Sequence, residues 1–371
     1  MMTWIAPDRV FDGERLREGV ALRLEGGRVA GIAPLSAAPE AERVEGTVSP
    51  GFVDLQVNGG GGVLLNDAPT PEGMEAIAAA HRALGTVAIL PTLITDAPEA
   101  MERAAEAAVA ARGRPGLLGL HAEGPHIAPA RRGTHDPRFI RPLDEATLGA
   151  VRRMRAAGCA VMVTLAPEAA PPGGIAALAA TGAVVSLGHS DCTFAAARDA
   201  IAEGAGAFTH LFNAMSPLGH REPGLVGAAL ASGLPAGIIA DGVHVAEPVL
   251  GIAWRARPAP DLTFLVSDAM PTVGGPDRFV LYGREIRVEE GRLVNAEGNL
   301  AGAHTTMAEG VARLVALGVA PDAVLRAAIT VPARLIGRGD LARLEGRAVA
   351  DLLRLDGAWR PMGPPGGGLP P

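Results

Sequence analysis

Short apolar runs recur through the middle of the chain, and alanine-rich segments with helical periodicity separate them. The clearest helical patterns, with apolar residues three and four positions apart, lie at 71–84, 97–112 and 144–158. The apolar runs of strand length lie at 50–57, 86–93, 116–123, 160–167, 183–190, 206–213, 236–244 and 263–270. Eight continuous apolar strands alternating with helices predict a (β/α)8 TIM-like barrel, with an open doubly wound sheet as the second possibility.

The two ends of the chain carry a different pattern. Residues 20–34, VALRLEGGRVAGIAP, alternate around a Gly-Gly pair, which predicts a β-hairpin. The segment 338–360 has a similar short-strand character. We therefore expect an α/β protein in which residues 47–339 form the barrel. We also expect a small β-sandwich domain built from both termini, residues 1–46 and 340–371, with a flexible Pro/Gly tail at its end.

Composition narrows the function classes. The formal charge is −7, and no apolar run reaches the ~18 residues that span a bilayer. No basic segment followed by an apolar stretch opens the sequence, so we expect no secretory signal. Two cysteines in 371 residues do not make a disulfide framework. We expect a cytoplasmic protein that has neither nucleic acid nor a membrane as partner. All 33 basic residues are arginine, which excludes Schiff-base chemistry, a phosphate loop ending in lysine and a carbamylated lysine bridging two metals.

Polar residues collect where the predicted strands end, which is the active-site face of such barrels. Glu123 ends the third strand, His189 the fifth and His210 the sixth. Two imidazoles and one carboxylate, with water in the fourth position, form a catalytic zinc set. Gln56 and Asn58 stand where related barrels carry His-x-His, and amides are poor zinc ligands. We therefore expect one cation held without first-strand ligands, although each residue taken alone could merely satisfy hydrogen bonds at a strand end.

Further polar residues suggest the chemistry around that cation. Asp268, at the end of the eighth strand, is placed to accept a proton from water and to return it to a leaving amine. His244 could polarise a scissile carbonyl or bind substrate hydroxyls. Arg221 could bind a phosphate or carboxylate in a forked geometry, with Asn213 and Ala214 offering an amide and a backbone N–H to the same anion.

Long ordered motifs carry a family resemblance. HAEGPHIAPARRGTHDP, VTLAPE, GHSDCT, THLFNAMSPLGHREPG, IADGVHV and SDAMPTVG follow one another between residues 121 and 274. In this order they closely resemble the N-acetylglucosamine-6-phosphate deacetylases of the amidohydrolase superfamily. The match extends from PGFVDLQVNG to PARLIG and into the C-terminal strands. One departure is His126, which replaces an aromatic residue and lies close in sequence to Glu123.

The resemblance implies a dimeric enzyme that hydrolyses the N-acetyl group of N-acetylglucosamine 6-phosphate, giving glucosamine 6-phosphate and acetate. It implies that Glu123, His189 and His210 bind one divalent metal ion per subunit, zinc or else iron, manganese or cobalt. Asp268 is then the acid/base, and His244 helps to polarise the carbonyl. The substrate-binding positions expected are Gln56, Thr134, His135, Asn213, Ala214, Arg221, Asp241, His244, Leu300, Ala301 and Gly302. Arg221 is expected to serve the neighbouring subunit of a homodimer.

Two other readings stay open at this stage. The same fold could serve an amidohydrolase that acts on a cyclic amide, an aminopurine or an N-acyl amino acid, because a fold does not fix function. A barrel that serves only as a binding scaffold should have lost ligands or the acid/base. Glu123, His189, His210, His244 and Asp268 are all present, which argues against a scaffold.

Overall fold

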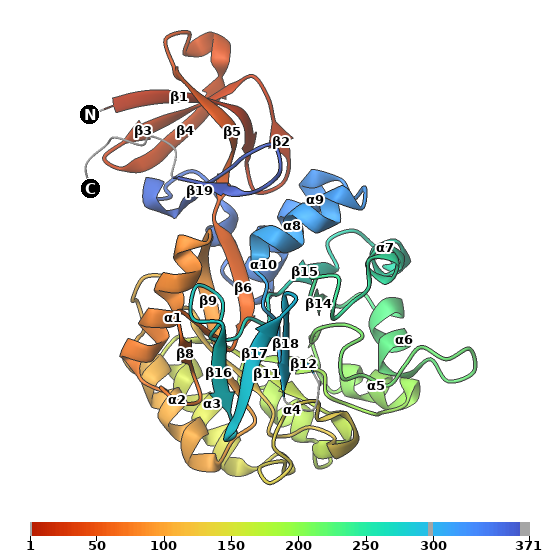
Figure 1. Cartoon of the computed structure of the whole chain (residues 1–371). Coiled ribbons are helices and arrows are strands. Elements are labelled where there is room, and N and C mark those ends of the chain that lie inside the picture. Colours follow the sequence, from red (N-terminus) through yellow and green to blue (C-terminus); the bar gives the residue numbers. More distant parts are fainter. Residues whose placement is uncertain (1, 296–299, 364–371) are drawn as a thin grey trace.

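The computed structural model describes residues 2–295 and 300–363, and the predicted Pro/Gly tail from residue 364 onwards lies outside this part. The expected fold class is confirmed: eight parallel strands form a nearly closed barrel, and a separate strand-rich domain joins both ends of the chain (Figure 1). The barrel strands are β6 (Phe52–Val57), β9 (Thr86–Ile94), β10 (Gly119–Glu123), β11 (Ala160–Leu165), β12 (Val184–Leu187), β13 (Ala207–Phe208), β14 (Ala236–Ile238) and β15 (Thr263–Leu265). Seven of the eight lie within the predicted apolar runs, and β9 extends one residue beyond its run, to Ile94. The domain limits predicted at 46–47 and 339–340 stay a prediction.

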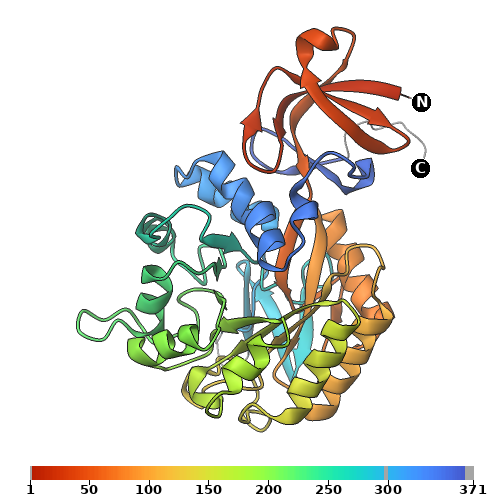
Figure 2. The same cartoon turned by 180° about the vertical axis from the view of Figure 1, so that it is seen from behind.

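Helices surround the barrel, as the view from behind in Figure 2 shows. They are α1 (Pro71–Ala83), α2 (Pro98–Ala110), α3 (Glu145–Ala156), α4 (Gly174–Ala179), α5 (Phe194–Ala202), α6 (Gly224–Ala231), α7 (Glu247–Ala256), α8 (Met307–Ala316), α9 (Pro321–Leu325) and α10 (Val331–Leu335). Local sequence fixes several starts: Thr70 caps α1 ahead of Pro71, and Thr306 with Glu309 forms a capping box on α8. With helices outside and side chains filling the inside, β6, β9 and β11 are buried along their whole length. No helix in the described residues is long and apolar enough to cross a membrane.

The barrel closes at the seam between its last and first strands. β15 and β6 do not pair as a ladder, but a bridge joins Ala269 to Val57 beyond the end of β15. The Asp268 N–H donates to the Gln56 carbonyl at 3.0 Å, and the Asn58 N–H donates to the Ala269 carbonyl at 2.9 Å. The closure is therefore made at the carboxyl end of the strands, where the candidate site lies.

A seven-stranded sheet at one end of the molecule combines both termini. Its order is β20-β19-β5-β1-β3-β4, with β2 paired to β1. The strands are β1 (Met2–Phe11), β2 (Leu16–Arg17), β3 (Val20–Glu25), β4 (Arg28–Pro34), β5 (Glu42–Pro50), β19 (Leu352–Leu355) and β20 (Pro361–Met362). Strands β3 and β4 form the predicted hairpin around Gly26 and Gly27. The core beside the seven-stranded sheet is aliphatic and includes Ile5, Val10, Leu22 and Leu352.

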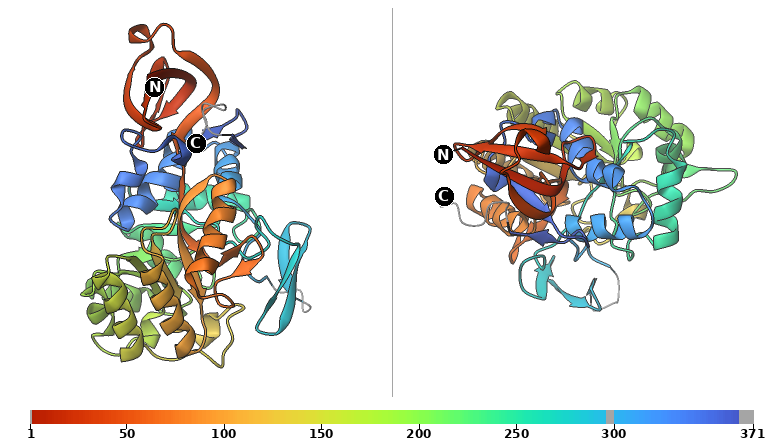
Figure 3. Two further views of the ribbon diagram at one scale, coloured as in Figure 1. Left: turned by 90° about the vertical axis from the view of Figure 1, so that its left-hand side faces the viewer. Right: turned by 90° about the horizontal axis from the view of Figure 1, so that it is seen from above.

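Two small antiparallel sheets lie beside the barrel strands. One is the hairpin β7 (Gly59–Gly60) with β8 (Val63–Leu64); the other joins β16 (Arg278–Leu281), β17 (Arg284–Glu289) and β18 (Arg292–Asn295). The three-stranded sheet stands off the side of the barrel (Figure 3). Tyr282, in its first turn, donates a hydrogen bond to the Thr95 carbonyl just after β9. That contact ties the sheet to a barrel strand end.

Candidate active site

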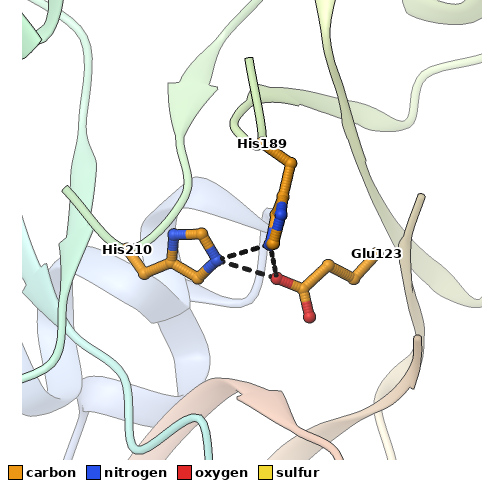
Figure 4. Close-up of side chains that lie close together, drawn as sticks. All are labelled: Glu123, His189 and His210. Carbon is orange, nitrogen blue, oxygen red and sulfur yellow. Dashed lines mark hydrogen bonds and ion pairs between the residues drawn. The ribbon is translucent and has the colours of Figure 1, made fainter. Parts of the chain in front are cut away.

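Three barrel strands bring Glu123, His189 and His210 together (Figure 4). Glu123 is the last residue of β10. His189 lies two residues after the end of β12, and His210 lies two residues after the end of β13. The Glu123 Oε1 lies 3.1 Å from His189 Nε2 and 2.9 Å from His210 Nε2, and the two Nε2 atoms are 3.0 Å apart. All three side chains are buried. The three residues thus present one ligand atom each toward a common point.

The hydrogen bonding of His189 shows that this arrangement suits a cation. Its Nδ1 lies 2.8 Å from the Arg131 carbonyl oxygen, which can only accept, so Nδ1 carries the hydrogen. In the neutral ring Nε2 then directs a lone pair at the Glu123 carboxylate, an arrangement that is repulsive unless positive charge lies between them. A backbone carbonyl that fixes the outer ring nitrogen is the usual support of a metal-binding histidine. One carboxylate and two imidazoles fit a divalent metal.

The charges at the cluster agree with this. Burial alone would raise the pKa of Glu123, but its close contacts with the His189 and His210 rings outweigh burial and hold that pKa well below its ordinary value. Burial also works against a charged His210, yet the hydrogen bond to Glu123 and its charge raise the pKa of His210. The carboxylate is therefore ionised and attracts positive charge, which a bound cation would supply.

The backbone at the strand ends is unusual. His189 has φ of 48°, His210 of 27° and Asp268 of 53°, all in the left-handed region that non-glycine residues rarely adopt. Such conformations cluster at functional sites because the surrounding structure must hold them in place. The three residues follow β12, β13 and β15, so all of them stand on the same rim of the barrel.

Asp268 lies beside the cluster, bound by the amides of the first strand. Its Oδ1 accepts hydrogen bonds from Asn58 Nδ2 at 2.7 Å and from Gln56 Nε2 at 3.1 Å. Gln56 Nε2 also donates to Glu123 Oε1 at 2.9 Å, so one amide joins both carboxylates. Burial and then the charge of Glu123 raise the pKa of Asp268 to about 6. A carboxyl group with that pKa can both accept and return a proton near neutrality.

His244 follows β14 and is oriented by Asp241. The His244 Nδ1 donates to Asp241 Oδ2 at 2.6 Å, and the other Asp241 oxygen accepts the backbone N–H groups of Val243 and His244. Burial would raise the pKa of Asp241, but the hydrogen bond from His244 outweighs it and the pKa is lowered. Asp241 is thus an ionised group that fixes the ring of His244.

A cavity of about 180 Å³ opens beside the cluster. Among its lining residues are Glu123, Thr134, His135, His189, His210, Asn213, Ala214, His244, Asp268, Leu300 and Gly302. The His135 ring lies 4.5 Å from that of His189, and its Nδ1 is 2.6 Å from the Thr95 hydroxyl. Burial, followed by the charge of His189, lowers the pKa of His135 to about 3, so the ring is neutral. A second cavity of about 830 Å³ adjoins along Gly133, Thr134, His135 and Leu300.

Not every predicted site residue reaches this cavity. Gln56 and Asp241 act through the hydrogen bonds described above, and Ala301 is buried between two lining residues. Arg221 is exposed, in the loop before α6, and is not among the lining residues of the described chain. His126 points elsewhere: its two ring nitrogens bond the Arg141 carbonyl and the Thr147 hydroxyl.

Sequence reasoning missed Asn58 as part of the site. Asp54 and Gln56 alternate along β6 and Asn58 directly follows it, and alternate residues of a strand share a face, so the signal was present. Asp54 accepts hydrogen bonds from the Ser267 backbone N–H and hydroxyl. Thr95, which contacts both His135 and Tyr282, had no recognisable signal because its partners are distant in sequence.

Comparison with known proteins gives a consistent picture. The chain is 38% identical to the N-acetylgalactosamine-6-phosphate deacetylase of Shewanella sp. (strain ANA-3) over 360 residues, which covers 94% of this chain and 90% of the relative. It is 37% identical to the N-acetylglucosamine-6-phosphate deacetylase of Homo sapiens over 382 residues, covering 95% and 87%. No family model matches the chain.

Solved structures agree. The N-acetylglucosamine-6-phosphate deacetylase of Pasteurella multocida superposes with a TM-score of 0.90 at 31% identity, covering 98% of each chain. The TM-score is 0.88, at 32% identity, for a mutant of the N-acetyl-D-glucosamine-6-phosphate deacetylase of Mycobacterium smegmatis in complex with N-acetyl-D-glucosamine-6-phosphate. This match covers 97% of this chain and 96% of the other.

Proposed function

The chain belongs to the family of N-acetylglucosamine-6-phosphate deacetylases, amidohydrolases that act on an amide bond, and from that premise we propose that it deacetylates N-acetylglucosamine 6-phosphate. The products are glucosamine 6-phosphate and acetate. The observation that carries the proposal is the buried set of Glu123, His189 and His210 with Asp268 beside it. This set combines metal-binding donors with a carboxyl group able to move a proton.

We propose that Glu123, His189 and His210 hold one divalent ion per subunit, with zinc as the first candidate. Iron, manganese and cobalt accept the same donors, and availability helps to decide among them. When bound, such an ion lowers the pKa of water toward ~7 and polarises a carbonyl oxygen. Gln56 and Asn58 use their amide N–H groups on carboxylates and are poor ligands, which supports a single ion.

Asp268 is proposed as the acid/base. Both amide hydrogen bonds fall on Oδ1, and no hydrogen bond in the described chain engages Oδ2. Oδ2 is therefore available to take a proton from the attacking water and to return it to the leaving amine. In its charged form, with hydrogen on both ring nitrogens, His244 is proposed to keep its Nδ1–H on Asp241 and to direct its Nε2–H at the acetyl carbonyl.

Arg221 is proposed to bind the phosphate. Asn213 and Ala214, which lie in the cavity wall, are proposed to contact the same anion. Arg221 is exposed and is not part of the cavity lining of its own chain. This supports the proposal that it binds the phosphate in the site of a neighbouring subunit in a homodimer. Thr134, His135 and the loop at 300–302 are proposed to contact the sugar. We also propose a cytoplasmic location, which the two unpaired buried thiols support.

N-Acetylgalactosamine 6-phosphate is a second candidate substrate. The relative from Shewanella is named for it and is as similar to this chain as the human glucosamine-type enzyme. The two sugars differ only in the configuration of one hydroxyl, so the acetamido chemistry is shared.

Acetate release from both phosphosugars and from unphosphorylated N-acetylglucosamine tests the proposal, with metal analysis of the same sample. We expect metal-dependent turnover of a phosphosugar and little turnover of the free sugar. Equal rates with and without phosphate would contradict the substrate assignment and leave the metal site standing. Activity on a cyclic amide or an N-acyl amino acid in place of the sugars would favour another amidohydrolase.

A further inference from the structure

A row of hydroxyl groups runs through the barrel directly beneath the metal-binding cluster. Ser186 Oγ lies 2.6 Å from Thr209 Oγ1, which lies 2.6 Å from Thr164 Oγ1. Thr164 Oγ1 is 2.7 Å from His121 Nε2, and His121 Nδ1 is 2.9 Å from the Leu55 carbonyl oxygen. The four side chains come from the adjacent strands β10, β11, β12 and the end of β13, and each is at most 1% exposed.

The direction of every hydrogen bond in this row follows from its last member. A carbonyl oxygen only accepts, so His121 Nδ1 carries the hydrogen that Leu55 receives. In the neutral ring His121 Nε2 is an acceptor, and Thr164 must donate to it. Thr164 has one hydroxyl hydrogen, so Thr209 must donate to Thr164, and Ser186 must in turn donate to Thr209. The row therefore has one consistent hydrogen-bond direction.

The row includes or contacts residues that come just before the cluster residues in the sequence. His121 precedes Glu123 by two residues, and Thr209 immediately precedes His210. Gly188, which precedes His189, has no room for a side chain: its Cβ would lie 2.9 Å from Thr209 Cβ and 3.0 Å from Thr164 Cγ2. The left-handed conformations of His189 and His210 need support from such packing.

We propose that Ser186, Thr209, Thr164 and His121 form a positioning chain, with one fixed hydrogen-bond direction, that holds Glu123, His189 and His210 at metal-binding geometry. The inference rests on the proposed metal function and adds to it the residues that set the geometry. None of the four residues lines the cavity, so we expect none of them to touch metal or substrate. They act by fixing the strand ends that carry the ligands.

Thr164→Val is the primary test, because valine keeps the shape and removes the hydroxyl. Zinc affinity of the full-length protein is measured by competition with a chromophoric chelator. We expect Thr164→Val to weaken zinc binding by about 10–100-fold, the usual effect of losing support behind a ligand. Thr164→Ser keeps the hydroxyl and should restore the wild-type affinity. Wild-type affinity in a folded Thr164→Val protein would overturn the proposal.

Thr47→Val is the matched control. Thr47 is a buried threonine of the terminal sheet whose hydroxyl has no hydrogen-bond partner in the described structure. Its replacement should leave zinc affinity unchanged. An equal loss in Thr47→Val would mean that any buried threonine has this effect, and would also overturn the proposal.

A second measurement depends neither on the folding of Thr164→Val nor on metal. ¹⁵N NMR of the imidazoles in the wild-type metal-free protein, with His121→Gln to assign the signal, reports which ring nitrogen of His121 is protonated. Hydrogen on Nδ1 supports the proposed positioning chain, and hydrogen on Nε2 contradicts its hydrogen-bond direction. If the wild-type protein binds no divalent metal, the proposed function fails, while the NMR result still decides the hydrogen-bond direction.

Discussion

The terminal sheet buries aliphatic side chains such as Ile5, Val10 and Leu22, whereas the barrel rim buries Glu123, Asp268 and several histidine side chains. Burial of the aliphatic residues stabilises the fold in proportion to their apolar area. Burial of the rim residues carries a desolvation cost, visible in the raised pKa of Asp268. The rim also holds histidines with positive φ. Mutations in the two regions should therefore have different effects. Changes in the terminal sheet should lower the stability of the protein, and changes at the barrel rim should lower its activity.

The largest effect on activity is expected at a metal ligand. Glu123→Gln removes the carboxylate that both histidines face, so the protein should lose its metal together with both water activation and carbonyl polarisation. We expect a fall in kcat/KM of more than about 10⁴-fold, beyond the range of general acid–base catalysis alone. Metal content and turnover are measured on one sample. A metal-loaded, active Glu123→Gln enzyme would falsify the ligand assignment.

A smaller effect is expected at the acid/base. Asp268→Asn keeps an acceptor for the Asn58 and Gln56 amides but no longer moves a proton. We expect kcat to fall by about 10²–10⁴-fold with metal content retained. Steady-state kinetics with metal analysis checks this. If KM changes and kcat does not, Asp268 binds substrate and is not the proton carrier.

A still smaller effect is expected at the proposed phosphate contact. Arg221→Ala removes a charged partner worth about 1.5–3 kcal/mol, which corresponds to a rise in KM of roughly 10–150-fold with kcat nearly unchanged. Kinetics on phosphorylated and free sugars measures the difference. The mutation should leave the low activity on the free sugar as it is. A similar loss on both sugars would argue against a phosphate role.

The smallest effect on catalysis is expected in the terminal sheet. Leu22 is fully buried, and Leu22→Ala should lower the free energy of unfolding by about 2–5 kcal/mol. The kcat of the folded protein should not change. Denaturant unfolding and kinetics below the transition check both halves of the statement. A fall in kcat without loss of stability would show that the two regions are coupled.

Much of the barrel could be predicted from the sequence because its strands lie in continuous apolar runs, whereas most helices between them mix apolar and polar residues with helical periodicity. The helix α6, GLVGAALA, is an exception. The three-stranded sheet at 278–295 was not predicted. Its residues do alternate around Gly283 and Gly291, both of which adopt positive φ, but the strands are mostly exposed and lack the apolar signal of the barrel.

The site was predictable to the extent that single strand ends determine it. Glu123, His189, His210 and Asp268 each end an apolar run, and parallel strands place such ends on one face. The link from Gln56 to two carboxylates depends on how β6 meets β15 at the seam, which no local pattern specifies. The role of Arg221, which lies in an exposed loop before α6, stays a prediction.

Tyr282 is the only tyrosine in the sequence, and its hydroxyl binds the Thr95 carbonyl. Fluorotyrosine incorporated during expression would therefore give one ¹⁹F resonance per chain. That signal would report whether the three-stranded sheet is seated against the barrel, with no label attached and no other residue replaced.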